Sequence, residues 1–96
     1  MRFYYILLLI TLATTTVDAK KLTVYTYDSF VSEWGPGPII EQKFEDKYNI
    51  DLELIAVDSA ATLLNKVILE GSNTKADIVL GLDMNLFDSA DKSGLF

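Results

Sequence analysis

The sequence predicts an α/β fold, in which three strands alternate with three helices and the strands form a parallel sheet. Short runs of strand-forming residues lie at 21–27, 50–57 and 76–80, and a segment with helical spacing of apolar residues follows each run. Strands joined by helices of this length run parallel, with right-handed crossovers and helices on both faces of the sheet. The expected order of elements is therefore βαβαβα.

The first strand is expected at Lys21–Tyr27, because its second half, VYTY, consists of β-branched and aromatic residues. The Gly-Pro repeat at 35–38 that follows prevents regular structure. Its glycines could direct backbone N–H groups at an anion, or the repeat could be a plain turn into a helix. Without a lysine, the repeat is not a phosphate-binding P-loop.

The first helix is expected from Pro38, which suits a first helical turn, to Asn49. Its apolar residues recur at every fourth position, and charged residues lie between them, so one face should be buried. The expected buried residues are Ile40, Phe44 and Tyr48, and the expected outward residues are Glu41, Lys43, Glu45 and Lys47.

The second strand is expected at Ile50–Val57, where apolar and charged residues first alternate. Asp58 or Ser59 can cap the helix that follows, and Gly71 ends it. The buried stripe of this helix is expected to contain Leu63, Leu64, Val67 and Ile68.

A polar loop at 72–75 leads to a third strand at Ala76–Leu80, which is apolar on both faces. Asn85 is expected to cap a last helix that runs through Ala90, and Gly94 is expected to end it.

The candidate site follows from where strands end in such a sheet. Ligands of open parallel sheets bind outside the carboxyl ends of the strands, where the strand order reverses. If the spatial order is 2-1-3, this crevice lies between the first and third strands. The loop from Tyr27 to Trp34 then faces the loop from Gly81 to Asn85.

Tyr27 and Trp34 could form an aromatic wall for a ligand ring, and a cationic ring would gain about 0.5–2 kcal/mol from each of them. Alternatively, Tyr27 ends its strand within the core and Trp34 packs on the sheet edge. The strand-end carboxylates could balance a cation or hold a divalent metal ion, or they could simply cap helices. These carboxylates are Asp28, Asp58 and Asp83.

Composition excludes several classes of function. The chain contains no cysteine and no histidine, so disulfides and the usual ligands of zinc, copper and haem are absent. Ser29 has no base beside it, and we expect no catalytic residue in this chain. A net charge of −6 without a basic patch argues against binding to nucleic acid or to an anionic membrane surface.

Residues 1–19 are expected to be a signal peptide. The apolar run at Ile6–Leu12 follows Arg2 and is too short to span a bilayer. The small residues Val17 and Ala19 fit the cleavage rule, so a mature chain without membrane insertion should begin at Lys20. An uncleaved N-terminal anchor is the alternative.

Two motifs carry a resemblance to a known family. Residues 22–38 read LTVYTYDSFVSEWGPGP, and residues 63–83 read LLNKVILEGSNTKADIVLGLD. With the final SGLF, these motifs resemble the periplasmic thiamine-binding proteins of ABC thiamine transporters. The strand–helix–ADIVLG pattern alone is common to many type 2 periplasmic binding proteins, whereas the combination is specific.

The resemblance implies a two-lobed α/β fold that closes on its ligand, with residues 20–96 as the N-terminal part of lobe one. It implies a periplasmic protein, not an enzyme, that needs no cofactor and delivers thiamine or its phosphates to a membrane permease. Tyr27 and Trp34 resemble members of the family's aromatic ligand cage, and Asp28, Ser29 and Asp83 are their neighbours in the same motifs. Because the family's members are longer, we expect a truncated chain that binds thiamine weakly or not at all alone.

Other functions stay open at the level of sequence. The chain could belong to a type 2 binding protein for iron, a polyamine or another small solute, although the aromatic loop favours an organic ring. It could be a metal-dependent hydrolase or phosphotransferase that uses the strand-end carboxylates, although a second carboxylate close behind Asp28 is missing. It could also be a remnant that does not fold alone.

Overall fold

The computed structural model describes residues 20–96, so the expected signal peptide at 1–19 lies outside the described residues. The elements follow the order β1 (Lys21–Tyr27), α1 (Asp28–Val31), α2 (Gly37–Tyr48), β2 (Asp51–Val57), α3 (Ala60–Glu70), η1 (Gly71–Asn73), β3 (Ile78–Val79), η2 (Met84–Leu86) and α4 (Phe87–Ser93). No helix within these residues is both long and apolar enough to cross a membrane.

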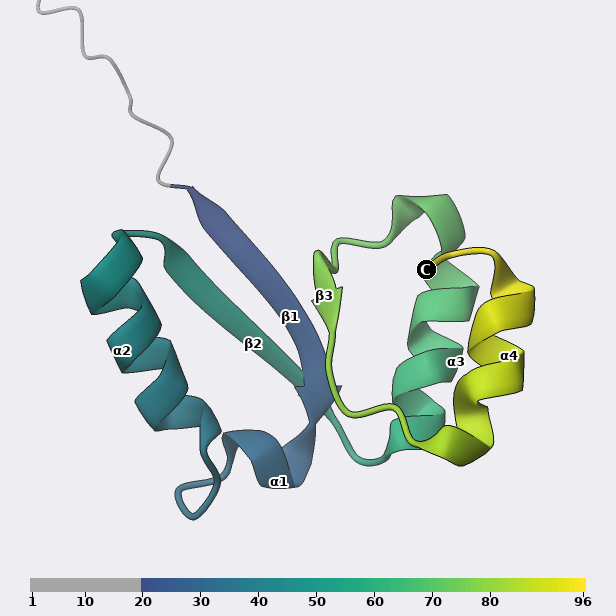
Figure 1. The fold of residues 1–96 in the computed structure, drawn as a ribbon, viewed down its shortest axis with the longest axis horizontal. Coiled ribbons are helices and arrows are strands. Elements are labelled where there is room, and N and C mark those ends of the chain that lie inside the picture. The colour runs from purple at the N-terminus through teal and green to yellow at the C-terminus, as the bar shows by residue number, and fades with distance from the viewer. Residues whose placement is uncertain (1–19) are drawn as a thin grey trace, which may run out of the picture.

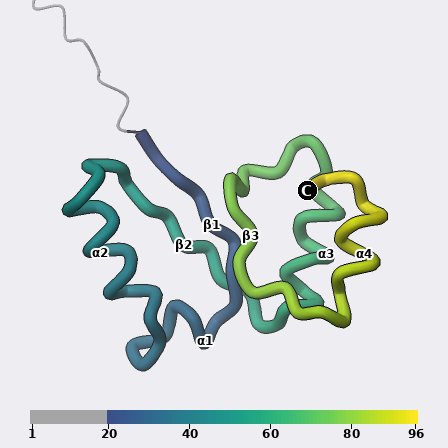
Figure 2. The backbone as a smooth tube through the Cα atoms, viewed as in Figure 1, coloured from purple at the N-terminus to yellow at the C-terminus, as the bar shows by residue number. Residues whose placement is uncertain are grey.

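The strands form a parallel sheet in the order β2-β1-β3, with α2 on one face and α3 and α4 on the other (Figure 1). Figure 2 shows the same layers in the course of the backbone. The predicted α/β class with a parallel sheet is therefore confirmed, and the strand order is the 2-1-3 order on which the expected position of the crevice depends. The strand β1 lies in the centre and pairs with β2 over its whole length, from Lys21 opposite Asp51 to Tyr27 opposite Val57.

The strand β3 is shorter than the predicted strand at 76–80. The hydrogen bonds of Asp77, the residue directly before β3, explain why the strand begins late. The backbone N–H of Asp77 donates to the carbonyl oxygen of Thr23 at 2.8 Å, but the N–H of Thr23 donates to the Asp77 carboxylate at 2.9 Å. A side chain thus replaces a backbone acceptor at the start of the ladder. Beyond Leu80, whose N–H still donates to Tyr25, Gly81 has φ of 111° and turns the chain away.

The core lies between the sheet and α3. Tyr25 of β1 is almost fully buried and packs with Leu63 and Val67 of α3. The helix begins as predicted, because the Ser59 hydroxyl accepts a hydrogen bond from the N–H of Thr62 at 3.1 Å. The predicted burial of Ile68 is wrong, since 43% of this residue is exposed. Each residue advances about 100° around a helix, which places it at the margin of the buried stripe.

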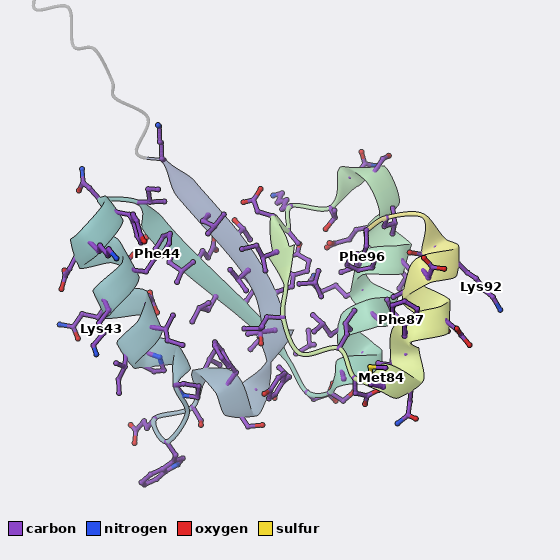
Figure 3. The ribbon with its side chains drawn as sticks, viewed as in Figure 1. Lys43, Phe44, Met84, Phe87, Lys92 and Phe96 are labelled. Atoms are coloured by element: carbon purple, nitrogen blue, oxygen red, sulfur yellow. The ribbon has the colours of Figure 1, made fainter. Side chains whose placement is uncertain are left out.

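The prediction for the face of α2 is largely wrong. Ile40 and Tyr48 are 45% and 52% exposed, whereas Phe44 is directed at the sheet, opposite to the outward Lys43 (Figure 3). Glu45, expected on the outside, instead accepts a hydrogen bond from the N–H of Leu52 at 3.0 Å. This bond ties α2 to the start of β2 through a carboxylate rather than through a continuous apolar stripe.

Because α2 covers its face of the sheet incompletely, an apolar trough of about 270 Å³ remains between them. Two of its lining residues, Ile78 and Leu80, come from the segment around β3 and stay partly exposed. The residues that line the trough are Leu22, Val24, Phe30, Ile40, Phe44, Leu52, Leu54, Ile78 and Leu80.

A polar brace fastens the end of α3 to the core. The Glu70 carboxylate accepts hydrogen bonds from the Tyr25 hydroxyl at 3.3 Å and from the Thr74 hydroxyl at 3.0 Å. Lys66 Nζ lies 3.1 Å from the same carboxylate and 5.0 Å from the centre of the Tyr25 ring. The hydroxyl of Thr74 in turn accepts from the N–H of Ala76 at 3.2 Å, which connects the brace to the segment before β3.

We predict that Glu70→Gln makes stability less dependent on pH in the acid range. Burial acts to raise the pKa of Glu70, but hydrogen bonds from Lys66, Tyr25 and Thr74 and the charge of Lys66 outweigh it. The pKa is therefore held below its ordinary value of 4.5. A lowered pKa contributes stability above the unfolded pKa, and this contribution is lost as the pH falls through the folded pKa. Urea unfolding at stepped pH should show a steeper acid loss for the parent chain than for the variant, and parallel curves would contradict the brace.

We predict that Thr26→Val stabilises the fold by about 1 kcal/mol, because it removes a hydroxyl that has lost water without gaining a partner. Thr26 is fully buried in β1, and its hydroxyl has no hydrogen-bond partner among residues 20–96. Thr26→Ser is the matched control, since it keeps the hydroxyl and removes the methyl group, and it should destabilise. Urea unfolding measures both, and a destabilised valine variant would show that the hydroxyl is satisfied.

Candidate ligand-binding rim

The carboxyl ends of β1 and β3 lie at the same end of the sheet, from which the chain continues into α1 and into the segment after β3 (Figure 1). We call this edge the rim and define it as residues 27–37 and 80–85. Its two segments contain three carboxylates, Asp28, Glu33 and Asp83, and no lysine or arginine. All three side chains are exposed, so the rim presents negative charge that would attract a cation.

Tyr27 connects the two segments of the rim. It is the last residue of β1, and its ring lies against Gly81, so closely that a Cβ atom on Gly81 would overlap the ring atoms Cδ1 and Cε1. The Phe30 ring approaches Tyr27 edge to face, with 6.2 Å between ring centres. The loops at Tyr27 and Gly81 therefore meet at the carboxyl ends of the first and third strands, as expected for the strand order 2-1-3.

The Gly-Pro repeat is a close-packing device. A Cβ atom at Gly35 would overlap the carbonyl oxygen of Ser29, and one at Gly37 would overlap that of Phe30. The N–H of Gly35 donates to the carbonyl of Ser32 at 2.9 Å, and the Ser32 hydroxyl donates to the carbonyl of Ser29 at the same distance. The glycines thus fold the loop back onto α1, which agrees with the plain-turn alternative rather than with an anion site.

Trp34 lies in this folded loop and is 91% exposed. The indole therefore packs against little else within residues 20–96, and the alternative in which it packs on the sheet edge is wrong. A large aromatic side chain left in solvent by a rigid loop has its surface free for a ligand or for another segment of protein.

The other predicted site residues lie close by in less distinctive settings. Asp28 and Ser29 form the exposed first turn of α1, where a carboxylate is favoured by the helix dipole. Asp83 Oδ1 accepts a hydrogen bond from the N–H of Asn85 at 3.0 Å and so caps η2. The predicted helix cap at Asn85 is therefore wrong, because Asp83 caps η2 and α4 begins only at Phe87. Asp58 is exposed, while its neighbour Ser59 caps α3.

The strand-end carboxylates do not converge on a metal. Within residues 20–96, no group of three or more His, Cys, Asp or Glu side chains lies close enough together to hold a metal ion. The geometry of this part of the chain therefore gives no support to the alternative of a metal-dependent hydrolase or phosphotransferase.

Sequence reasoning missed the role of Gly81 and the contact of Phe30 with Tyr27. The signal for Gly81 was present, because a glycine directly after a strand often marks close approach of another group. Its partner could not be read from the sequence, since Tyr27 is 54 positions away and meets Gly81 only through the strand order.

Comparison with known proteins gives a consistent set of relatives, although no family model matches the chain. The thiamine-binding periplasmic protein of Escherichia coli is 54% identical over 89 residues, which cover 92% of this chain and 27% of that protein. The thiamine-binding periplasmic protein of Haemophilus influenzae is 47% identical over 78 residues, which cover 80% of this chain and 24% of that protein.

The structural comparison agrees with these relatives. A solved periplasmic thiamin binding protein is 55% identical and superimposes with a TM-score of 0.74, over 79% of this chain and 24% of that one. The α/β fold with its parallel sheet is thus shared with a solved binding protein. The chain spans about a quarter of the length of the curated relatives it matches.

We predict that Gly35→Ala destabilises the chain by about 1–3 kcal/mol, the usual cost of forcing an extra carbon into a closely packed place. The Cβ atom would meet the carbonyl oxygens of Ser29 and Phe30, and the loop would have to leave α1. Urea unfolding measures the loss, and the fluorescence of Trp34, the single tryptophan, reports the loop itself.

Pro36→Ala is the control, because it changes the same loop without placing an atom against α1. It should cost less than the glycine variant. If Gly35→Ala is as stable as the parent chain, the loop does not depend on this close approach.

Proposed function

We propose that this chain belongs to an extracytoplasmic solute-binding protein that binds thiamine or its phosphates. The observation that carries the proposal is the identity of about half with proteins named thiamine-binding periplasmic proteins, over nearly the whole chain. In this proposal, residues 1–19 are a cleaved signal peptide and residues 20–96 are the N-terminal part of lobe one. The protein resides in the periplasm, is not an enzyme and delivers its ligand to the permease of an ABC importer.

The chemistry of the rim supports thiamine as the ligand. Thiamine combines a flat pyrimidine with a cationic thiazolium, and aromatic faces attract both rings. Tyr27 and Trp34 provide such faces at the carboxyl edge of the sheet, and Trp34 is almost fully exposed. The rim also carries the exposed carboxylates of Asp28, Glu33 and Asp83 and no basic residue, and their negative charge would attract the cationic thiazolium ring.

The rim supplies one wall of the proposed site. Tight binding of a small molecule requires that most of its surface is buried. Since the relatives are about four times as long as the segment they share with this chain, we infer that the opposite wall comes from the part of such a protein that this chain does not match. In this proposal Tyr27 and Trp34 contact the ligand rings directly, while Asp28, Ser29 and Asp83 lie around them.

We predict that residues 20–96 can replace the matched segment of the Escherichia coli relative and that the grafted protein binds thiamine. In the grafted protein, Trp34→Ala should weaken binding about tenfold or more, because a cation on an aromatic face is lost in a desolvated site. Titration calorimetry measures both affinities.

The matched control is Tyr48→Ala. Tyr48 is another half-exposed aromatic residue, at the end of α2 away from the rim, and its removal should leave the affinity unchanged. A folded graft that gives no heat with thiamine but gives heat with a polyamine or another solute would refute thiamine as the ligand. Equal affinities before and after the Trp34 change would remove this residue from the site.

A further inference from the structure

We propose that Gly81 is a positioning residue for the ligand site, and that its missing side chain sets the orientation of the Tyr27 ring. The proposal rests on the proposed function, in which Tyr27 contacts thiamine. Gly81 itself touches no ligand in this account. It acts through the ring that lies against it.

The contact geometry shows which part of the ring Gly81 occupies. A Cβ atom at Gly81 would be equally close to Cδ1 and Cε1 of Tyr27, but 3.7 Å from Cγ. A position above the ring face that is this close to Cδ1 and Cε1 would lie much nearer to Cγ. Gly81 therefore abuts the Cδ1–Cε1 edge of the ring, roughly in the ring plane.

This edge contact leaves the faces of the ring uncovered by Gly81. The faces are the parts of an aromatic ring that attract a stacked ring or a cation, whereas the edge carries partial positive charge. Phe30 approaches at an interplanar angle of 62° and limits how far the ring can turn. Gly81 and Phe30 together hold the ring in one orientation before a ligand arrives, and such preorganisation favours affinity.

Only glycine can serve at position 81. Its φ of 111° lies in a region that side chains rarely adopt, and a Cβ atom would collide with the ring. Since the ring is the free end of a side chain, it would give way first and rotate about its χ angles. Gly71 and Gly94 also have positive φ, of 55° and 70°, but a Cβ atom on either would meet nothing within 4 Å. A side chain at Gly71 or Gly94 would therefore strain the backbone without colliding with a ring.

The test uses Gly81→Ala in the complete chain and in the grafted protein, with Gly71→Ala as the strain control. NMR of the Tyr27 ring should show cross-peaks from the ring protons to the Hα protons of Gly81 in the parent. The ring signals should shift in Gly81→Ala and stay in place in Gly71→Ala. Unchanged ring signals in Gly81→Ala would overturn the proposal, whatever thiamine does.

Thiamine affinity in the grafted protein gives the second readout. Gly81→Ala should weaken binding roughly tenfold when Tyr27 is present, the size expected for one misplaced aromatic contact. It should cause no further loss in a Tyr27→Ala background, and an equal loss in both backgrounds would overturn the proposal. If even the parent graft fails to bind thiamine, the proposed ligand is refuted, and the ring signals still decide the role of Gly81.

A variant that does not fold is also informative. If Gly81→Ala unfolds the chain, the combination with Tyr27→Ala should restore folding, because the colliding ring is gone. Circular dichroism measures this rescue. A double variant that stays unfolded would mean that backbone strain at position 81, rather than the ring, accounts for the glycine.

Discussion

The backbone pairing of β1 with both of its neighbours is the constraint on which the site depends. Seven consecutive residues of β1 pair with β2, while β3 adds two pairs that the Thr23–Asp77 exchange extends at their start. Because all three strands are parallel, this arrangement brings the end of β1 beside the end of β3. Tyr27 and Gly81 meet for this reason, while the loop with Trp34 folds back onto α1, which follows β1 directly.

The elements that the sequence predicted well have local causes. The bounds of β1 follow from strand-forming residues between a charged start and a helical turn. The helix α2 ends at Asn49 as predicted, and Asn49 adopts the left-handed conformation common at helix ends. The parallel direction of the strands follows from the helices that join them. In contrast, the inward direction of Glu45 depends on the N–H of Leu52, which lies on the edge strand β2 and takes the Glu45 carboxylate as its acceptor, and periodicity carries no such information.

At the rim, too, local features could be predicted from the sequence and contacts between distant residues could not. Position at a strand end marked Tyr27 as a site candidate, and a loop rich in glycine and proline marked Trp34. That a glycine 54 positions away holds the Tyr27 ring by its edge follows only from three-dimensional contact. The roles of Asp28, Ser29 and Asp83 toward a ligand stay predictions. One carboxylate oxygen of Asp83 already accepts a hydrogen bond from the N–H of Asn85 and so caps η2.

In the proposed function, the rim forms one wall of a thiamine site, and the other wall comes from the part of such a protein that this chain does not match. A crystal structure of the grafted protein with thiamine bound tests this most directly. The account predicts that a ring of thiamine lies on a face of Tyr27 and against the indole of Trp34, with the Tyr27 edge still seated on Gly81. A ligand bound without contact to either aromatic residue would contradict it.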